Sequence, residues 1–229
     1  MLLIDVALFS STVAIVSYEI VRAKDKLIEI LRKDPVISEY DLVLGYKESF
    51  LKRVPITLDL KIFPSLSISG ISNSGKSKLT EYILKHTNLE KVLVNSYKED
   101  YKGIKCKKVT LENTEKFLDL LLEGKLRNKL IVFDECLTIL SSKNCAKKLH
   151  TLLTKNRHLN LYIICIFQEL NKSIVPFKSL FTSRLTMRMI QKSDVESSLG
   201  ISLEEYKVLQ NREFILLSDD IYFGKTYDI

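Results

Sequence analysis

A glycine-rich segment in the first half of the chain carries the clearest chemical signal. The pattern G-x-x-x-x-G-K-[ST] is matched in full by Gly70, Ile71, Ser72, Asn73, Ser74, Gly75, Lys76 and Ser77. In a loop of this kind the backbone N–H groups point inward and hold phosphate oxygens, and the following helix presents its positive N-terminal end. We therefore predict that residues 70–77 bind the phosphates of a nucleotide.

Individual residues of this loop have distinct predicted roles. Lys76 is expected to reach the β- and γ-phosphates, and the Ser77 hydroxyl is expected to ligate Mg²⁺. Gly70 and Gly75 permit backbone angles and a close approach that a Cβ atom would prevent. The predicted cofactors are accordingly ATP and Mg²⁺.

Two carboxylates follow an apolar run later in the chain. Residues 130–133 read Leu-Ile-Val-Phe and lead directly into Asp134 and Glu135. An acidic residue at the end of such a strand helps to hold Mg²⁺ in P-loop enzymes, and this is the role predicted for Asp134. Glu135 is predicted to polarise the attacking water as a general base. Water as the acceptor favours ATP hydrolysis over the phosphorylation of a small molecule.

These residues need a scaffold of alternating strands and helices, and the sequence pattern predicts one. Predicted strands are the short apolar runs at residues 66–69, 91–95, 130–133 and 161–167. Predicted helices, from the spacing of apolar residues, cover residues 76–86, 114–122 and 145–154. Strands that are apolar throughout are typical of a parallel sheet covered on both faces. We predict an α/β fold with a mostly parallel sheet and helices on both of its faces.

Further short strands are predicted on either side of this core. They cover residues 40–44, 54–60, 183–190, 213–217 and 221–223. The first two are expected to form a small antiparallel lead-in, and the last two a terminal hairpin. No Gly/Ser-rich linker divides this part of the chain, so we predict one ATPase domain over residues 35–229.

The N-terminal segment, residues 1–34, is predicted to be a separate helix that ends at Asp34-Pro35. Its uncharged run, residues 6–18, is shorter than the roughly 20 apolar residues that a bilayer needs. Basic residues follow residue 21, which would suit a cytoplasmic side. Two interpretations remain open: a membrane anchor formed by residues 1–21, or an amphipathic helix that packs or self-associates. The predicted location is cytoplasmic, with a tether to the cytoplasmic membrane face under the first interpretation.

Composition excludes several other classes of protein. With 46% hydrophobic residues and a net charge of +7, the chain is too apolar and too weakly charged to be intrinsically disordered. The four cysteines form no CxxC pair, and His86, His150 and His158 share no ligand spacing, so we assign them no metal. The excess of 35 Lys and Arg over 28 Asp and Glu suits a polyanionic partner.

Four stretches, the first of which contains the phosphate loop, make the sequence resemble the FtsK/HerA superfamily of ring-forming DNA-translocating ATPases. It is most similar to the FtsK/SpoIIIE-like motor domains of conjugative elements and plasmids. The first stretch is residues 55–77, which lead into the loop and include it, and the second is residues 92–101. The third is the apolar strand that ends in Asp134 and Glu135, and the fourth is residues 156–168. One departure is Asn95, where the family often has aspartate. The resemblance covers roughly residues 40–225.

The resemblance implies a RecA-like fold and roles for two further residues. Gln168, at the tip of an apolar strand, would contact the γ-phosphate or the lytic water and sense hydrolysis. Arg157, which precedes the same strand, would serve as an arginine finger on the nucleotide of a neighbouring subunit. The implied activity is ATP-driven translocation of double-stranded DNA of plasmid, conjugative or phage-like origin. The implied assembly is a homo-oligomeric ring, and we expect a hexamer.

Contact with DNA is expected to involve the phosphate backbone, because the sequence has no motif that reads bases. The basic stretches are residues 102–108, 143–148 and 155–158. Backbone contacts are independent of sequence and sensitive to salt, as a translocase requires. Three alternatives stay open: a viral genome-packaging ATPase, a secretion or pilus-assembly ATPase acting on protein, and a nucleotide-dependent assembly switch.

Overall fold

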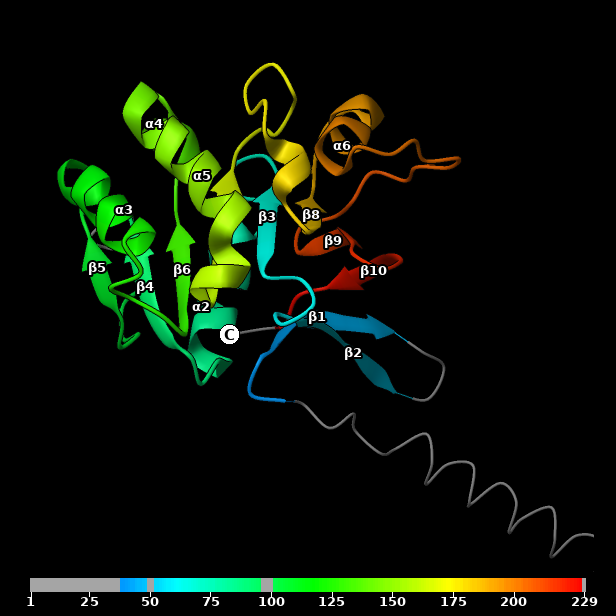
Figure 1. Cartoon of the computed structure of the whole chain (residues 1–229). Coiled ribbons are helices and arrows are strands. Elements are labelled where there is room, and N and C mark those ends of the chain that lie inside the picture. Colours follow the sequence, from blue (N-terminus) through cyan, green and yellow to red (C-terminus); the bar gives the residue numbers. More distant parts are fainter. Residues whose placement is uncertain (1–37, 49–51, 96–100, 228–229) are drawn as a thin grey trace, which may run out of the picture. The chain divides into compact units, whose positions relative to one another are not determined.

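The computed structural model describes residues 38–48, 52–95 and 101–227 (Figure 1). The predicted N-terminal helix, residues 1–34, lies outside the described residues, and so do both interpretations of residues 1–21. Residues 37–47 and 55–229 form one compact unit, which contains every residue of the predicted site.

Ten strands and five helices are described. The strands are β1 (Asp41–Glu48), β2 (Arg53–Asp59), β3 (Ser65–Ser69), β4 (Glu90–Val94), β5 (Lys107–Val109), β6 (Lys129–Phe133), β7 (Leu161–Phe167), β8 (Ser183–Met187), β9 (Glu213–Leu217) and β10 (Ile221–Lys225). The helices are α2 (Lys76–His86), α3 (Thr114–Leu122), α4 (Cys136–Leu140), α5 (Lys143–Leu159) and α6 (Lys192–Leu199).

All ten strands join one sheet in the order β2-β1-β10-β9-β8-β3-β7-β6-β4-β5. The six strands from β8 to β5 are parallel to their neighbours. Antiparallel pairing begins at β8–β9 and continues through β10 to β1. In Figure 1 the arrowheads of β3, β4, β5 and β6 point to the same edge of the sheet. The predicted α/β fold with a mostly parallel sheet is therefore confirmed.

Helices cover both faces of the sheet, as the apolar strands predict. Successive residues of a strand point to opposite faces. In β6, Leu130 and Val132 pack in the cluster that contains residues of α2. Ile131 and Phe133 pack in the cluster that contains residues of α3 and α5. A third, smaller cluster joins α6 to β9.

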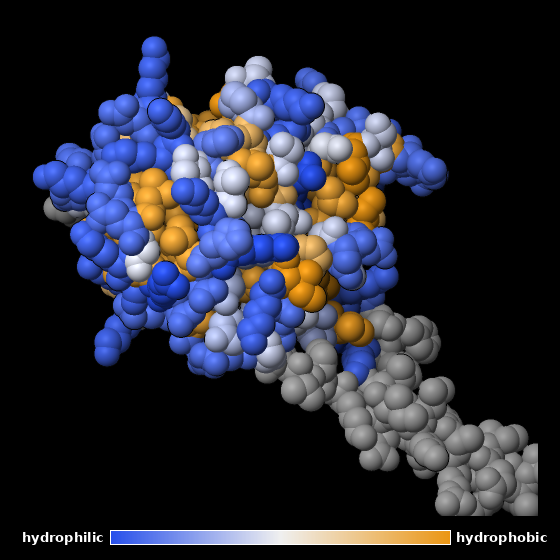
Figure 2. Space-filling model, in the orientation of Figure 1, coloured by the Kyte–Doolittle hydropathy of each residue, from blue (hydrophilic) through white to orange (hydrophobic). Residues whose placement is uncertain are grey.

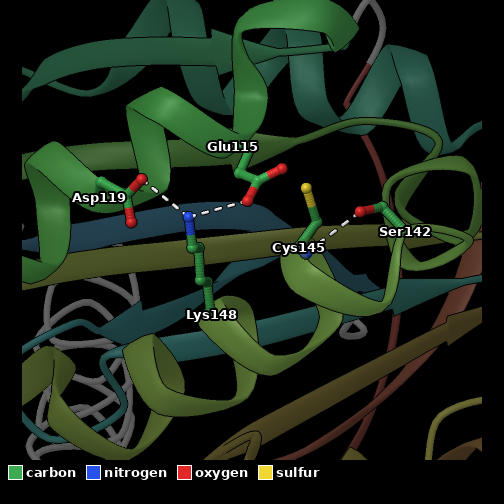
Figure 3. A network of polar contacts seen from close by, with 5 residues as sticks. All are labelled: Glu115, Asp119, Ser142, Cys145 and Lys148. Atoms are coloured by element: carbon green, nitrogen blue, oxygen red, sulfur yellow. Dashed lines mark hydrogen bonds and ion pairs between the residues drawn. The ribbon is translucent and has the colours of Figure 1, made fainter.

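Polar contacts also join the two helices on one face. Lys148 Nζ of α5 donates to Glu115 Oε1 at 3.1 Å and to Asp119 Oδ2 at 2.8 Å, and both acceptors belong to α3 (Figure 3). Hydrogen bonding to Asp119 is the main reason why the pKa of Lys148 is raised. Lys148 thus holds α3 against α5, which accounts for one cation of the basic stretch at residues 143–148.

The register of the parallel strands fixes what meets at their carboxyl ends. Ser69 of β3 pairs with Phe167 of β7. Phe133 of β6 pairs with Cys165 of β7 and with Val94 of β4. The residues that follow these strands therefore lie close together at one edge, where α/β sheets bind their ligands.

Candidate active site

The phosphate loop connects β3 to α2, as predicted. Gly75 caps α2 in a left-handed conformation, with φ of 108°. A Cβ atom at this position would lie 3.1 Å from Met187 Cε and 3.4 Å from Arg212 Cγ. Gly75 is therefore required both by the backbone angle and by the neighbouring side chains.

Lys76 begins α2 and bends back over the loop. Its Nζ donates to the carbonyl oxygens of Gly70 at 2.6 Å and of Ile71 at 2.9 Å. Burial lowers the pKa of Lys76, and the negative charges of Glu135 and Asp134 oppose that shift. Lys76 follows β3 and the two carboxylates follow β6, and both strands are parallel to β7, so the loop lysine and the carboxylates lie at the same edge of the sheet.

Asp134 follows β6 and is only 6% exposed. Its Oδ2 accepts a hydrogen bond from the Tyr101 hydroxyl at 2.9 Å, and its Oδ1 accepts one from the Glu135 N–H at 2.9 Å. These two hydrogen bonds fix the orientation of the carboxylate.

These residues fit a magnesium ion. Mg²⁺ prefers oxygen ligands and is usually bound by one or two protein groups together with phosphates and water. Asp134 supplies oriented carboxylate oxygens, and the Ser77 hydroxyl lies in the exposed first turn of α2. Asp134 and Ser77 are thus the residues that would hold the ion.

Glu135 and Gln168 meet at the same edge of the sheet. Gln168 follows β7, and its Nε2 donates to Glu135 Oε2 at 3.3 Å. Glu135 has a left-handed backbone, with φ of 46°. Residues other than glycine seldom adopt this backbone conformation, and those that do are concentrated at turns and functional sites. The structure therefore brings the predicted base and the predicted sensor into direct contact.

Arg157 lies elsewhere. It is exposed near the end of α5, directly before β7, so it occupies the sheet edge opposite the phosphate loop. Its Nη2 donates to the Ile62 carbonyl oxygen at 2.8 Å. It also lines a pocket of about 360 Å³, together with Tyr40 and Lys61. Arg157 therefore does not reach the phosphate loop of its own chain, and its predicted role in a neighbouring site stays a prediction.

Two residues next to the acidic pair were not predicted as site residues. The Asn95 side chain donates through Nδ2 to the carbonyl oxygens of Asp134 at 3.3 Å and Glu135 at 3.5 Å. Tyr101 holds the Asp134 carboxylate. Both belong to the stretch of residues 92–101 that resembles the FtsK/HerA family, which was the only signal in the sequence.

Two more residues reach the site from the C-terminal part of the chain. A pocket of about 290 Å³ beside the loop is lined by Asn73, Gly75, Lys76, Ser77, Lys78, Asn211 and Arg212. The N–H of Arg212 donates to the Ser74 carbonyl oxygen at 3.0 Å. No local pattern in the sequence signals this contact, because it depends on how β8, β9 and β3 are arranged.

No helix in the described ranges combines the length and the apolar character that crossing a membrane requires. Within the same ranges, no three His, Cys, Asp or Glu side chains gather as a metal-binding group.

No protein-family model matches the sequence, and no curated protein matches it. Several solved structures do match it. The cytoplasmic domain of the type VII secretion ATPase EccC from Thermomonospora curvata matches with a TM-score of 0.65 and 16% identity, over 86% of this chain and 29% of that one. The pCW3 conjugation coupling protein TcpA, solved with ATPγS, matches with a TM-score of 0.62 and 18% identity, over 83% of this chain and 66% of that one.

A viral protein also matches. The genome packaging NTPase B204 from Sulfolobus turreted icosahedral virus 2, solved with AMPPCP, has a TM-score of 0.54 and 16% identity, over 72% of this chain and 100% of that one. The chain thus spans less than a third of the EccC chain and all of the B204 chain. Identities this low show a shared fold. The chain has the fold of the FtsK/HerA-type P-loop ATPases, as the resemblance in sequence predicted.

Proposed function

We propose that the protein is an ATP-hydrolysing motor that moves double-stranded DNA, working as a homo-oligomeric ring that we expect to be a hexamer. The observation that carries the hydrolytic part is the contact between Glu135 and Gln168, beside Lys76 and Asp134. A base next to a hydrogen-bond donor, at the sheet edge that carries the phosphate loop, is what the activation of a water molecule requires.

Each residue has a distinct task in this mechanism. Lys76 would leave the loop carbonyls and bind the β- and γ-phosphates, and Ser77 and Asp134 would hold Mg²⁺, which would neutralise phosphate charge. Glu135 accepts a proton from the attacking water. Gln168, already hydrogen-bonded to Glu135, is placed to respond when that proton arrives, because protonation changes the charge of its acceptor.

DNA as the substrate is supported by exposed cations and by two of the similar proteins. Lys105 and Lys107 are exposed near the β5 edge of the sheet, and neither forms an ion pair within the described residues. TcpA is a conjugation coupling protein and B204 is a genome packaging NTPase. Figure 2 shows one face of the molecule that is mostly hydrophilic, with separate apolar areas between the polar ones.

Protein secretion is the second candidate, because the similar structures include the secretion ATPase EccC and EssC. The ATPase site would be the same, so the two candidates differ in what the basic surface contacts. A protein substrate does not need exposed lysines that bind phosphates, and duplex DNA should then leave the rate of hydrolysis unchanged.

The test is the ATPase rate of the full chain with and without duplex DNA, across a range of salt concentrations. We expect DNA to raise the rate and the effect to weaken as salt increases. For DNA binding, the slope of log K against the logarithm of salt concentration should become shallower by about 1 to 2 in the double variant Lys105→Ala/Lys107→Ala. Lys207→Ala, which removes an exposed lysine in the segment between α6 and β9, outside the basic stretches, is the matched control.

Three outcomes separate the candidates. If DNA raises the ATPase rate and the Lys105→Ala/Lys107→Ala variant reduces this effect, the result supports the DNA motor. If DNA leaves the ATPase rate unchanged, the result contradicts DNA as the substrate and favours the secretion candidate. A chain that binds ATP without hydrolysing it contradicts both and favours an assembly switch.

A further inference from the structure

The pocket beside the phosphate loop has a wall that the loop motif does not supply. On one side are loop and helix residues, from Asn73 to Lys78. On the other side is the turn of Asn211 and Arg212, which directly precedes β9. A pocket formed by a phosphate loop and a second segment is suited to hold a nucleotide between them.

The turn is fixed to the loop through its backbone. The Arg212 N–H donates to the Ser74 carbonyl oxygen at 3.0 Å, and the Arg212 carbonyl oxygen accepts from the Thr226 N–H at 2.9 Å. Arg212 has φ of 71°, a left-handed conformation that residues other than glycine seldom adopt. Its side chain starts close to the loop, since a Cβ on Gly75 would lie 3.4 Å from Arg212 Cγ.

A second arginine ties the same turn to the loop. The Arg188 carbonyl oxygen accepts from the Ile71 N–H at 3.2 Å. The Arg188 side chain donates through Nη1 to Asn211 Oδ1 at 3.1 Å. Asn211 is thus a positioning residue, because it links Arg188 and the loop to the turn that carries Arg212.

The placement of the carboxylates tells which end of a nucleotide faces this wall. Asp134 and Glu135 follow β6, which lies on the β7 side of β3, whereas the Asn211–Arg212 turn precedes β9, which lies on the β8 side. The acidic pair marks the side where water would attack, which is the γ-phosphate side. Neither carboxylate is among the described residues that line the pocket, which extends along α2 to Lys78. The Asn211–Arg212 wall therefore lies on the nucleoside side of the loop.

We propose that Arg212 binds the nucleotide on its nucleoside side, through the portion that ATP and ADP share. A guanidinium group suits this place because it pairs with phosphate oxygens and stacks on planar rings. The inference rests on the proposed function only in that the bound molecule is a nucleotide. It adds a contact from the C-terminal strands to a site that the motif assigned to residues 70–77 and the acidic pair.

The experiment is a calorimetric titration of the full chain with Mg²⁺ and either ADP or ATPγS. In Arg212→Ala we expect both affinities to fall by a similar factor, about 10- to 100-fold, as for a lost hydrogen bond to a charged group. Arg212→Lys should lose less than Arg212→Ala for both nucleotides. Arg127→Ala removes an exposed arginine outside the pocket and should bind both nucleotides like the wild type.

Each other result overturns the proposal. A loss confined to ATPγS would place Arg212 at the γ-phosphate, and unchanged affinities would remove Arg212 from the site. If Arg212→Ala does not fold, Arg212→Gln, which keeps the stem against Gly75, allows the same comparison. Failure of the wild type to bind either nucleotide would contradict the proposed function itself, which is a separate result.

Discussion

At the scale of single residues, Lys76 and Glu135 separate nucleotide binding from hydrolysis. Lys76→Ala removes the cation beside the phosphates and should abolish measurable binding of Mg·ATP. Glu135→Gln keeps the shape of the side chain but cannot accept a proton, so binding should persist while hydrolysis slows by about 10²- to 10⁴-fold. Titration with ATPγS and a steady-state phosphate assay measure the two effects. A wild-type rate in Glu135→Gln would show that Glu135 is not the base.

Tyr101 offers a second test at this scale. Tyr101→Phe removes the hydrogen bond to Asp134 Oδ2 and should leave the carboxylate less well oriented for Mg²⁺. We expect the Mg²⁺ concentration needed for half-maximal ATPγS binding to rise by about 10-fold, with binding in EDTA unchanged. Tyr222→Phe, which removes an exposed bond to Asp219 at 3.2 Å, is the matched control. Equal Mg²⁺ dependence in both variants would contradict the role of Tyr101.

At the scale of elements, the sequence predicts best where a motif or a continuous apolar run defines the segment. The predicted bounds of α2, α3 and β7 coincide with those observed. Helix α5 extends beyond its prediction, and β5, α4 and α6 were not predicted at all. Strand β5 and helix α4 have too few residues to show a period, and α6 has only two buried apolar residues, Val195 and Leu199.

The packing of α5 against the sheet yields a prediction of stability. Leu149 of α5 is fully buried in the cluster shared with α3. Leu149→Ala should lower the free energy of unfolding by about 2–5 kcal/mol, because it leaves a cavity. Leu120→Ala makes the same chemical change on α3 at a side chain that is 40% exposed, and should cost far less. Urea unfolding of both variants measures the difference. Similar losses of unfolding free energy in the two variants would contradict tight packing of Leu149 between α5 and α3.

At the scale of the whole molecule, the parallel sheet separates two chemically distinct edges. The carboxyl ends of β3, β6 and β7 carry the phosphate loop, the acidic pair and Gln168. Arg157 lies at the amino end of β7. The fold and the residues that follow each strand were predictable, because they depend on local patterns. The contacts of Arg212 were not, because they arise from strands that pair across more than a hundred residues of chain.

The position of Arg157 makes its proposed role in a neighbouring subunit testable by mixing. Arg157→Ala should leave ATPγS affinity nearly unchanged and depress hydrolysis strongly, since arginine fingers contribute about 10³- to 10⁵-fold in rate. Arg127→Ala, which removes another exposed arginine outside the basic stretches, is the matched control and should keep wild-type turnover. Mixing Arg157→Ala with Glu135→Gln subunits should restore part of the activity. An Arg157→Ala subunit keeps its base, and an adjacent Glu135→Gln subunit supplies the arginine, so one interface is complete. If mixed rings form and no activity returns, Arg157 does not act across the interface.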